Sequence, residues 1–219
     1  MSLNFSKRVF TSIILLIILL IGLFTNKYIW ICLLIAVSII SFIEFNNLIN
    51  KTSNKAIYQS YIYKIISFLY LIFFVYVGYN LYILSITFVL FILLVCIFSD
   101  TGGYVIGKLI GGKKLTHISP NKTISGSVGS FIFSLFSIII LSFFNDINNQ
   151  PVNLIQLIFI TLFFSLTCQL GDLFISYFKR LANVKDTGSI LPGHGGLLDR
   201  IDGVIFVLPV AYIIEKIFT

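Results

Sequence analysis

Residues 154–173 read LIQLIFITLFFSLTCQLGDL, and eighteen uncharged residues in this run precede Asp172. About 20 predominantly apolar residues, wound as an α-helix, cross the ~30 Å hydrocarbon core of a bilayer. The run therefore predicts a membrane-spanning helix with a carboxylate close to one end.

Six further apolar runs of similar length lie at residues 9–24, 28–45, 61–78, 81–98, 128–145 and 201–218. In the whole chain of 219 residues, 58% are hydrophobic and 11% are charged, against ~25% charged residues in soluble domains. This composition excludes an ordinary soluble globule. It predicts an all-α, polytopic integral membrane protein with about seven transmembrane helices, six to nine being compatible with the pattern. We expect a minimal turn at Gly78-Tyr79-Asn80, where a merged or re-entrant hairpin would change the count.

Positive charge is unevenly distributed along the chain, whose formal net charge is +7. When successive loops alternate between the two sides, thirteen of the 15 Lys and Arg residues share the side of the N-terminus, and only Lys27 and Lys216 face the other. The positive-inside rule then predicts a cytoplasmic N-terminus. The charge also favours attraction to anionic lipids or phosphorylated substrates over nucleic acid, although a topology signal alone explains it equally well.

Two windows on the predicted cytoplasmic side, residues 100–126 and 172–202, concentrate the polar chemistry. They hold thirteen of the 23 charged residues and ten of the 15 glycines. A site that binds phosphate and metal requires acids, bases and glycines, as these two windows contain. Loops that merely connect two helices could be shorter. No repeat or linker divides the chain, so we expect a single membrane-embedded domain over residues 1–219.

The second window begins with Asp172. If the helix continues past Gly171, then Asp172, Ser176 and Lys179 lie on one helical face, because they stand at i, i+4 and i+7. A carboxylate so close to hydrocarbon needs a partner, a cavity or a metal. The alternatives for Asp172 are an ion pair with Lys179 or exposure to water.

Two more carboxylates, Asp199 and Asp202, precede the last apolar run. They are three positions apart and share a helical face. Acids in a first helical turn also interact favourably with the helix dipole, which is the plainer explanation. Two carboxylates so close repel each other unless a cation lies between them. Mg²⁺, with waters and substrate phosphates completing its coordination shell, is such a cation.

The glycine-rich stretch Pro192-Gly193-His194-Gly195-Gly196 lies between these acids. Such a loop can point several N–H groups at an anion, and a simple tight turn is the alternative. His194 alone indicates no catalysis, and no second histidine is placed for a zinc site.

The first window has a similar composition. Asp100 is expected to end the span at 81–98 as Asp172 ends its own span. Ser119, Asn121, Lys122 and Thr123 could bind phosphate, since lysine offers a charge and the hydroxyls offer hydrogen-bond donors. Solvation of an ordinary loop explains them equally well.

The second window resembles the signature of the CTP:phosphatidate cytidylyltransferase family, also called CDP-diacylglycerol synthase. The resemblance is carried by the run Ser176-x-x-Lys179-Arg180-x4-Lys185-Asp186-x5-Pro192-Gly193-His194-Gly195-Gly196-x2-Asp199-Arg200-x-Asp202. Upstream, Asp100-Thr-Gly-Gly-Tyr, Ser119-Pro-Asn-Lys122-Thr and Gln169-Leu-Gly-Asp172 are similar to family motifs in the expected order. The motifs cover about residues 95–205, while residues 1–94 are similar only in being membrane helices. Ser125 departs from the family pattern, so no role is transferred to it.

The resemblance implies the reaction CTP + phosphatidate → CDP-diacylglycerol + pyrophosphate in phospholipid biosynthesis, at a cavity on the cytoplasmic side. It implies Mg²⁺ with a second cation, for which K⁺ is the candidate. Asp172 and Asp199 are the expected metal ligands, with Asp202 and Asp100 as further ones. By the same resemblance, the expected catalytic residues are Asp172, Asp199, Lys179 and Arg200. The expected contacts to substrate are Ser119, Lys122, Thr123, Ser176, Arg180, Lys185, Gly193, His194, Gly195 and Gly196.

The same resemblance implies CTP and bilayer phosphatidate as partners, and a bacterial inner-membrane setting. The oligomeric state stays open, with a homodimer among the options. A CTP-dependent lipid kinase or another lipid phosphotransferase would use the same cations and carboxylates. A transporter with Asp172 and Asp100 as intramembrane sites is a further alternative, disfavoured because the polar residues gather on one side and not at the midplane.

Overall fold

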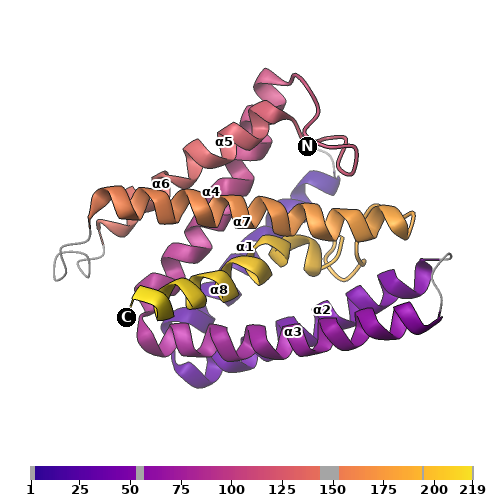
Figure 1. Cartoon of the computed structure of the whole chain (residues 1–219), viewed down its shortest axis with the longest axis horizontal. Coiled ribbons are helices and arrows are strands. Elements are labelled where there is room, and N and C mark those ends of the chain that lie inside the picture. The colour runs from indigo at the N-terminus through magenta and orange to yellow at the C-terminus, as the bar shows by residue number, and fades with distance from the viewer. Residues whose placement is uncertain (1–2, 53–56, 144–152, 194, 219) are drawn as a thin grey trace. The chain divides into compact units, whose positions relative to one another are not determined.

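The computed structural model describes residues 3–52, 57–143, 153–193 and 195–218. Its elements in these ranges are α1 (Leu3–Phe24), α2 (Lys27–Lys51), α3 (Ile57–Leu84), α4 (Ile86–Ile110), α5 (Ile124–Ser134), α6 (Phe136–Leu141), α7 (Leu154–Leu181) and α8 (Leu198–Phe218) (Figure 1). In the described ranges, β-pairing is confined to isolated bridges between Lys114 and Thr123 and between Leu191 and Gly195. The predicted all-α class is confirmed.

Five helical stretches of the described chain are long and apolar enough to cross a membrane. They lie at Lys27–Lys51, Tyr58–Leu84, Ile86–Ile110, Ile124–Leu141, which comprises α5 and α6, and Leu154–Leu181. Large apolar side chains remain exposed along them, as a lipid-facing surface requires. The protein is therefore a polytopic membrane protein, as predicted. The apolar part of α1, Phe10–Phe24, is shorter, and α8 carries charges near both ends. Helices lie in the described part of each of the seven expected positions, and the count of seven crossings stays a prediction.

Three helix boundaries differ from the sequence expectation. Gly78 and Asn80 lie inside α3, which ends at Leu84. A Cβ at Gly78 would lie 2.9 Å from Leu34 Cδ1, and the Gly78 carbonyl accepts a hydrogen bond of 3.0 Å from Trp30 Nε1. The glycine therefore serves the close approach of α2 and not a turn. Similarly, α4 continues ten residues past Asp100 to Ile110, and α7 continues nine residues past Asp172 to Leu181, so the expectation that these two aspartates end their spans was wrong.

The helices form two compact units, each assembled from separated segments of the chain. Unit 1 comprises Met1–Ile86 and Phe178–Ile201, and unit 2 comprises Thr87–Tyr177 and Asp202–Thr219. The prediction of a single domain stays a prediction.

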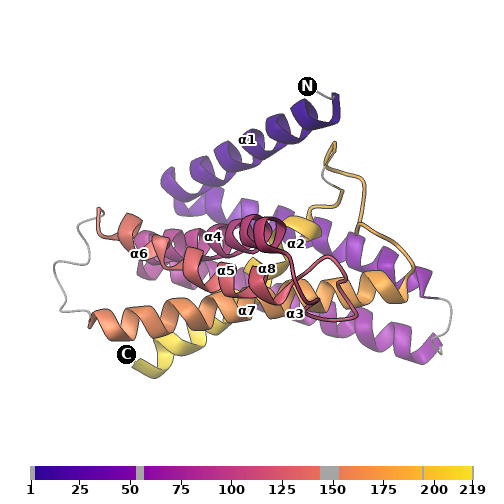
Figure 2. The ribbon, with the colours of Figure 1, turned by 90° about the horizontal axis from the view of Figure 1, so that it is seen from above.

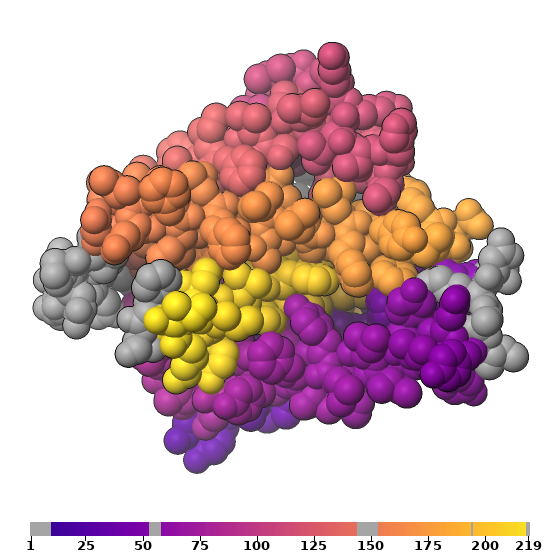
Figure 3. Space-filling model, viewed as in Figure 1, coloured from indigo at the N-terminus to yellow at the C-terminus, as the bar shows by residue number. Residues whose placement is uncertain are grey.

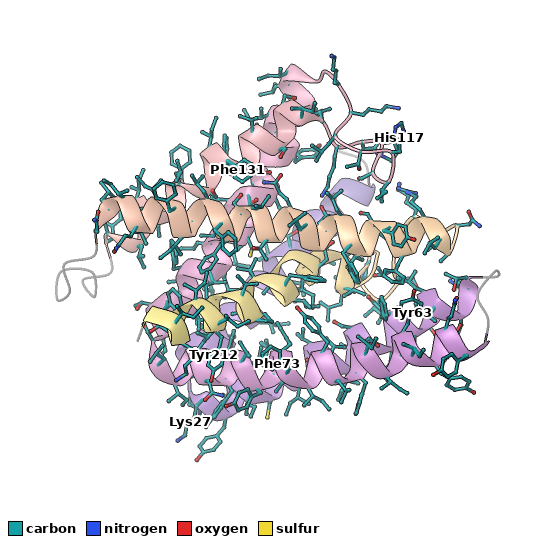
Figure 4. The ribbon with its side chains drawn as sticks, viewed as in Figure 1. Lys27, Tyr63, Phe73, His117, Phe131 and Tyr212 are labelled. Carbon is teal, nitrogen blue, oxygen red and sulfur yellow. The ribbon has the colours of Figure 1, made fainter. Side chains whose placement is uncertain are left out.

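In unit 1, α2 and α3 pack along each other, as both ribbon views show (Figures 1 and 2). The rings of Trp30 and Tyr82 stack with centroids 5.7 Å apart. At the other end of the two helices, the ring of Phe178 packs edge-on against Phe45 and Tyr63 (Figure 4), with ring centroids 5.0 and 5.7 Å away. The last turn of α7 is thereby anchored to α2 and α3.

The outer surface of α3 is drawn in the space-filling view (Figure 3). Its exposed side chains include Ile65, Phe68, Leu69 and Ile72. An apolar exposed stripe of this kind fits contact with lipid tails.

Unit 2 is held together by close helix packing. A Cβ at Gly102 of α4 would lie 2.5 Å from the Gly129 carbonyl oxygen of α5, and one at Gly126 would lie 2.8 Å from the Gly103 carbonyl oxygen. Small residues at such crossings let two membrane helices approach through their backbones. The glycines after Asp100 are therefore packing residues of α4, which is why the helix continues through them.

Candidate active site

In unit 1, Lys179 of α7 and Asp199 of α8 form a buried ion pair. Lys179 Nζ lies 2.8 Å from Asp199 Oδ1, and the two side chains are only 12% and 7% exposed. The other carboxylate oxygen, Asp199 Oδ2, accepts hydrogen bonds from Thr187 N (2.8 Å), Thr187 Oγ1 (3.0 Å) and Gly196 N (3.1 Å). Two predicted site residues are thus brought together, and the orientation of this carboxylate is fixed from both sides.

The glycine-rich stretch forms a tight turn. Leu191 and Gly195 exchange two backbone hydrogen bonds of 2.9 and 3.2 Å, and Gly193 and Gly195 have φ values of 79° and 86° that favour glycine. The N–H groups of Gly195 and Gly196 are used within the chain, by the Leu191 carbonyl and the Asp199 carboxylate. The predicted role of this loop in binding nucleotide stays a prediction, and His194 lies outside the described residues.

A second acid of unit 1, Glu44 of α2, was not predicted. It is 2% exposed and accepts hydrogen bonds from Leu197 N (3.0 Å), Leu198 N (2.9 Å) and Thr187 Oγ1 (2.9 Å). The rule that drew attention to Asp172, that an acid inside an apolar run needs partners, would also have identified Glu44. The sequence did not indicate which residues donate to Glu44, because they lie more than 140 positions away.

A cavity of about 580 Å³ opens beside Glu44 in unit 1. It is lined by polar side chains at the Lys51 end of α2 and by the segment that follows α7: Asn47, Asn50, Lys51, Asp186, Thr187 and Ser189. Its volume is typical of small-molecule sites.

In unit 2, Asp172 forms the second carboxylate–lysine pair. Asp172 Oδ2 contacts Lys122 Nζ, with side chains that are 29% and 28% exposed, and Ser176 Oγ donates to Asp172 Oδ1 over 3.2 Å. The helix α7 does continue past Gly171 to Leu181, so the condition for Asp172, Ser176 and Lys179 to share a helical face is met. The ammonium paired with Asp172 is Lys122 and not Lys179.

A small turn presents Lys122 in unit 2. Leu115 N donates to the Lys122 carbonyl over 2.8 Å, and Lys122 N donates to the Ser119 carbonyl over 3.1 Å. Thr123 is the N-cap of α5, because its hydroxyl accepts from Gly126 N over 3.0 Å. Ser119 is buried, and His117 of the same loop is exposed (Figure 4).

Asp100 and Asp202, the two further candidate metal ligands, also belong to unit 2. Asp100 is exposed on α4, where Cys168 Sγ donates to its Oδ1 over 3.7 Å. Asp202 is 6% exposed, and its Oδ1 accepts from Gly203 N over 2.9 Å. The expected phosphate-binding residues Arg180, Lys185 and Arg200 are exposed parts of unit 1.

The oxygen donors of both pairs suit Mg²⁺. Asp172 is partly exposed and has lone pairs beyond its contacts with Lys122 and Ser176, whereas Asp199 offers only Oδ1. Within either unit, no three His, Cys, Asp or Glu side chains of the described residues cluster as a metal cage. Mg²⁺ is usually held by one or two carboxylates plus waters and phosphates, so these residues fit that ion. The joint binding of one ion by Asp172 and Asp199 stays a prediction.

The chain matches the model of the cytidylyltransferase family over residues 49–218. Among curated proteins it is similar to the phosphatidate cytidylyltransferases of Staphylococcus haemolyticus (strain JCSC1435), Staphylococcus aureus (strain COL) and Bacillus subtilis (strain 168), with 50%, 48% and 44% identity over 122 residues. The aligned part is 55% of this chain and 46%, 46% and 44% of those relatives. The chain thus spans about half the length of the curated relatives it matches. The matched region contains both carboxylate–lysine pairs and most of the chain, which shows that this protein belongs to the cytidylyltransferase family.

Proposed function

We propose that the protein transfers the cytidylyl group of CTP to phosphatidate, forming CDP-diacylglycerol and pyrophosphate. The observation that carries the proposal is the family match over residues 49–218, which contains both carboxylate–lysine pairs. The names of the relatives support phosphatidate as the acceptor. Neither the lipid kinase nor the transporter alternative is favoured by these similarities.

In the proposed reaction, an oxygen of the phosphatidate phosphate attacks the α-phosphorus of CTP. A new P–O bond forms, and the bond from the α-phosphorus to the bridging oxygen breaks, so that pyrophosphate leaves with the electron pair. The nucleophile belongs to the substrate, and no nucleophilic side chain is required. Because two polyanions must meet, catalysis consists mainly of charge neutralisation and in-line positioning.

Residues of the two carboxylate–lysine pairs would supply these two contributions. Asp199 and Asp172 would hold Mg²⁺. A second cation would assist it, and K⁺ is the candidate for that cation. Bound there, Mg²⁺ would neutralise phosphate charge during the transfer. Lys179 and Lys122 pair with the two carboxylates, and both would contact phosphate when substrate is bound.

We place this reaction at the cytoplasmic face of a bacterial inner membrane, with the N-terminus inside. The bias of thirteen Lys and Arg residues against two supports this orientation. The same charge would attract anionic lipids, including phosphatidate itself. A homodimer is compatible with the proposal and is not required by it.

The test uses purified protein, phosphatidate in mixed micelles, Mg²⁺ and CTP that carries phosphorus-32 at either the α- or the γ-phosphate. Cytidylyl transfer puts the α-label into lipid and releases the γ-label as pyrophosphate. A lipid kinase would put the γ-label into lipid and release CDP. Absence of α-labelled lipid with active, folded protein would contradict the proposal.

A further inference from the structure

We propose that Glu44 is a positioning residue for the cytidylyl-transfer site: it holds Thr187 and residues 196–198 in the conformation that orients Asp199. Glu44 lies on α2, before the region matched by the family model, which begins at residue 49. The part of the inference that concerns catalysis rests on the proposed function.

The hydrogen bonds of Glu44 all go to one short segment. Its Oε1 accepts from Leu197 N, and its Oε2 accepts from Leu198 N and Thr187 Oγ1, over 2.9–3.0 Å. Among the described residues no lysine or arginine pairs with Glu44. A buried carboxylate is costly unless hydrogen bonds satisfy it, so the segment and Glu44 depend on each other.

The glycines of the segment fit around this carboxylate. A Cβ at Gly188 would lie 2.6 Å from Glu44 Oε1, and a Cβ at Gly196 would overlap Glu44 Oε2 and Thr187 Oγ1. Only glycine lets the backbone approach the buried acid so closely at both positions. The glycine-rich character of this part of the chain is therefore explained in part by Glu44.

Glu44 is linked to Asp199 in two ways. First, Glu44 accepts hydrogen bonds from the N–H groups of Leu197 and Leu198, which directly precede Asp199 at the start of α8. The first N–H groups of a helix have no partner within the helix, so an acceptor there satisfies them. In addition, Thr187 Oγ1 lies 2.9 Å from Glu44 Oε2 and 3.0 Å from Asp199 Oδ2. Loss of Glu44 would release both the backbone before Asp199 and the hydroxyl that contacts its carboxylate.

The first experiment compares wild-type protein with Glu44→Gln, purified in detergent without metal or substrate. A glutamine offers one acceptor oxygen and places an NH₂ group against a backbone N–H. Hydrogen–deuterium exchange in peptides covering residues 187–198 should become at least about tenfold faster, the factor that corresponds to losing a hydrogen bond to a charged acceptor. With substrates added, kcat for CDP-diacylglycerol formation should fall about tenfold or more. Glu215→Gln, at the only other glutamate, should match wild type in both measurements.

The second experiment isolates the link through Thr187. Thr187→Val removes the hydroxyl and keeps the shape of the side chain, whereas Thr187→Ser keeps the hydroxyl. We expect the valine variant to lose activity in the same direction as Glu44→Gln and the serine variant to retain it. If Glu44→Gln fails to fold, the comparison of Thr187→Val with Thr187→Ser still tests the link between Glu44 and Asp199. Equal activity of these two variants would overturn that link.

The outcomes separate the two proposals. Faster exchange with unchanged kcat, or lost activity with unchanged exchange, would each overturn the positioning role of Glu44. If the wild-type protein makes no CDP-diacylglycerol, the proposed function fails, while the exchange data still decide whether Glu44 holds the segment.

Discussion

Lys179 and Asp199 are twenty positions apart in the chain, and their side chains form an ion pair of 2.8 Å from which most solvent is excluded. A buried pair of this kind is weak evidence for stability, because desolvation offsets much of the attraction. Its place in a family signature makes a catalytic use the better explanation. The consequence is that removing Lys179 should affect substrate use more than folding.

Lys179→Ala tests this consequence. We expect kcat/KM for CTP and phosphatidate to fall about 10–100-fold, because a charge-assisted contact to phosphate is lost. Asp199 retains three hydrogen bonds from Thr187 and Gly196, but loss of its buried cationic partner should still lower stability, so the rates are compared per folded molecule. Lys27→Ala, an exposed lysine on the opposite side of the predicted topology (Figure 4), is the control. Unchanged kinetics for both substrates would exclude the role of Lys179.

Lys122→Ala separates catalysis from stability more cleanly. Lys122 and Asp172 are both more than a quarter exposed, so breaking their pair should change the free energy of unfolding by less than about 1 kcal/mol. The rate of CDP-diacylglycerol formation should nevertheless fall about tenfold or more. Thermal unfolding in detergent and the lipid-labelling assay measure the two quantities. A loss of stability without a loss of rate would show that Lys122 is structural.

Thr123 should behave as a helix cap. Its hydroxyl accepts from Gly126 N, and replacement of such a cap by alanine costs about 1 kcal/mol. Thr123→Ala should therefore lower the unfolding temperature, whereas Thr123→Ser should keep it near the wild-type value. If the alanine variant is as stable as wild type and its KM for CTP rises, the phosphate-binding role predicted from sequence is the correct one.

Gly102→Ala should disrupt the packing of α4 against α5. The added methyl group would lie 2.5 Å from the Gly129 carbonyl oxygen, which is closer than any carbon–oxygen contact tolerates, so overpacking should cost about 1–3 kcal/mol or more. Thr101→Ala, at the exposed neighbour in the same helical turn, should stay within about 0.5 kcal/mol of wild type. Equal unfolding temperatures for the two variants would show that α4 and α5 do not pack as described.

Much of the fold follows from the sequence, because long uncharged runs have one stable form in a bilayer. The extension of α7 beyond Gly171 could only be assumed, because Asp172, Lys179 and Arg180 follow that glycine. The role of Gly78 was harder to predict, since a glycine can serve a turn or a close helix contact, and only the position of the neighbouring helix decides between them. The partner of Lys179 could not be predicted either, because it depends on how segments distant in sequence fold together.

Within the site, a similar limit applies. The sequence pointed to Asp172, Asp199 and Lys179 through their spacing and the family resemblance. It did not point to Glu44, which lies among membrane helices and outside every motif. Its hydrogen bonds to Leu197 and Leu198 are made to the backbone, which has no signature in a sequence.

The most direct measurement is the rate of CDP-diacylglycerol formation, per folded molecule and at saturating Mg²⁺, for wild type, Asp172→Asn, Asp199→Asn and the double variant. If both carboxylates serve one metal-dependent transfer, each single variant loses most of the activity, by about 100-fold or more, and the double variant is no slower than the worse single one. Near-normal rates in either single variant, or losses that simply multiply, would contradict a shared site.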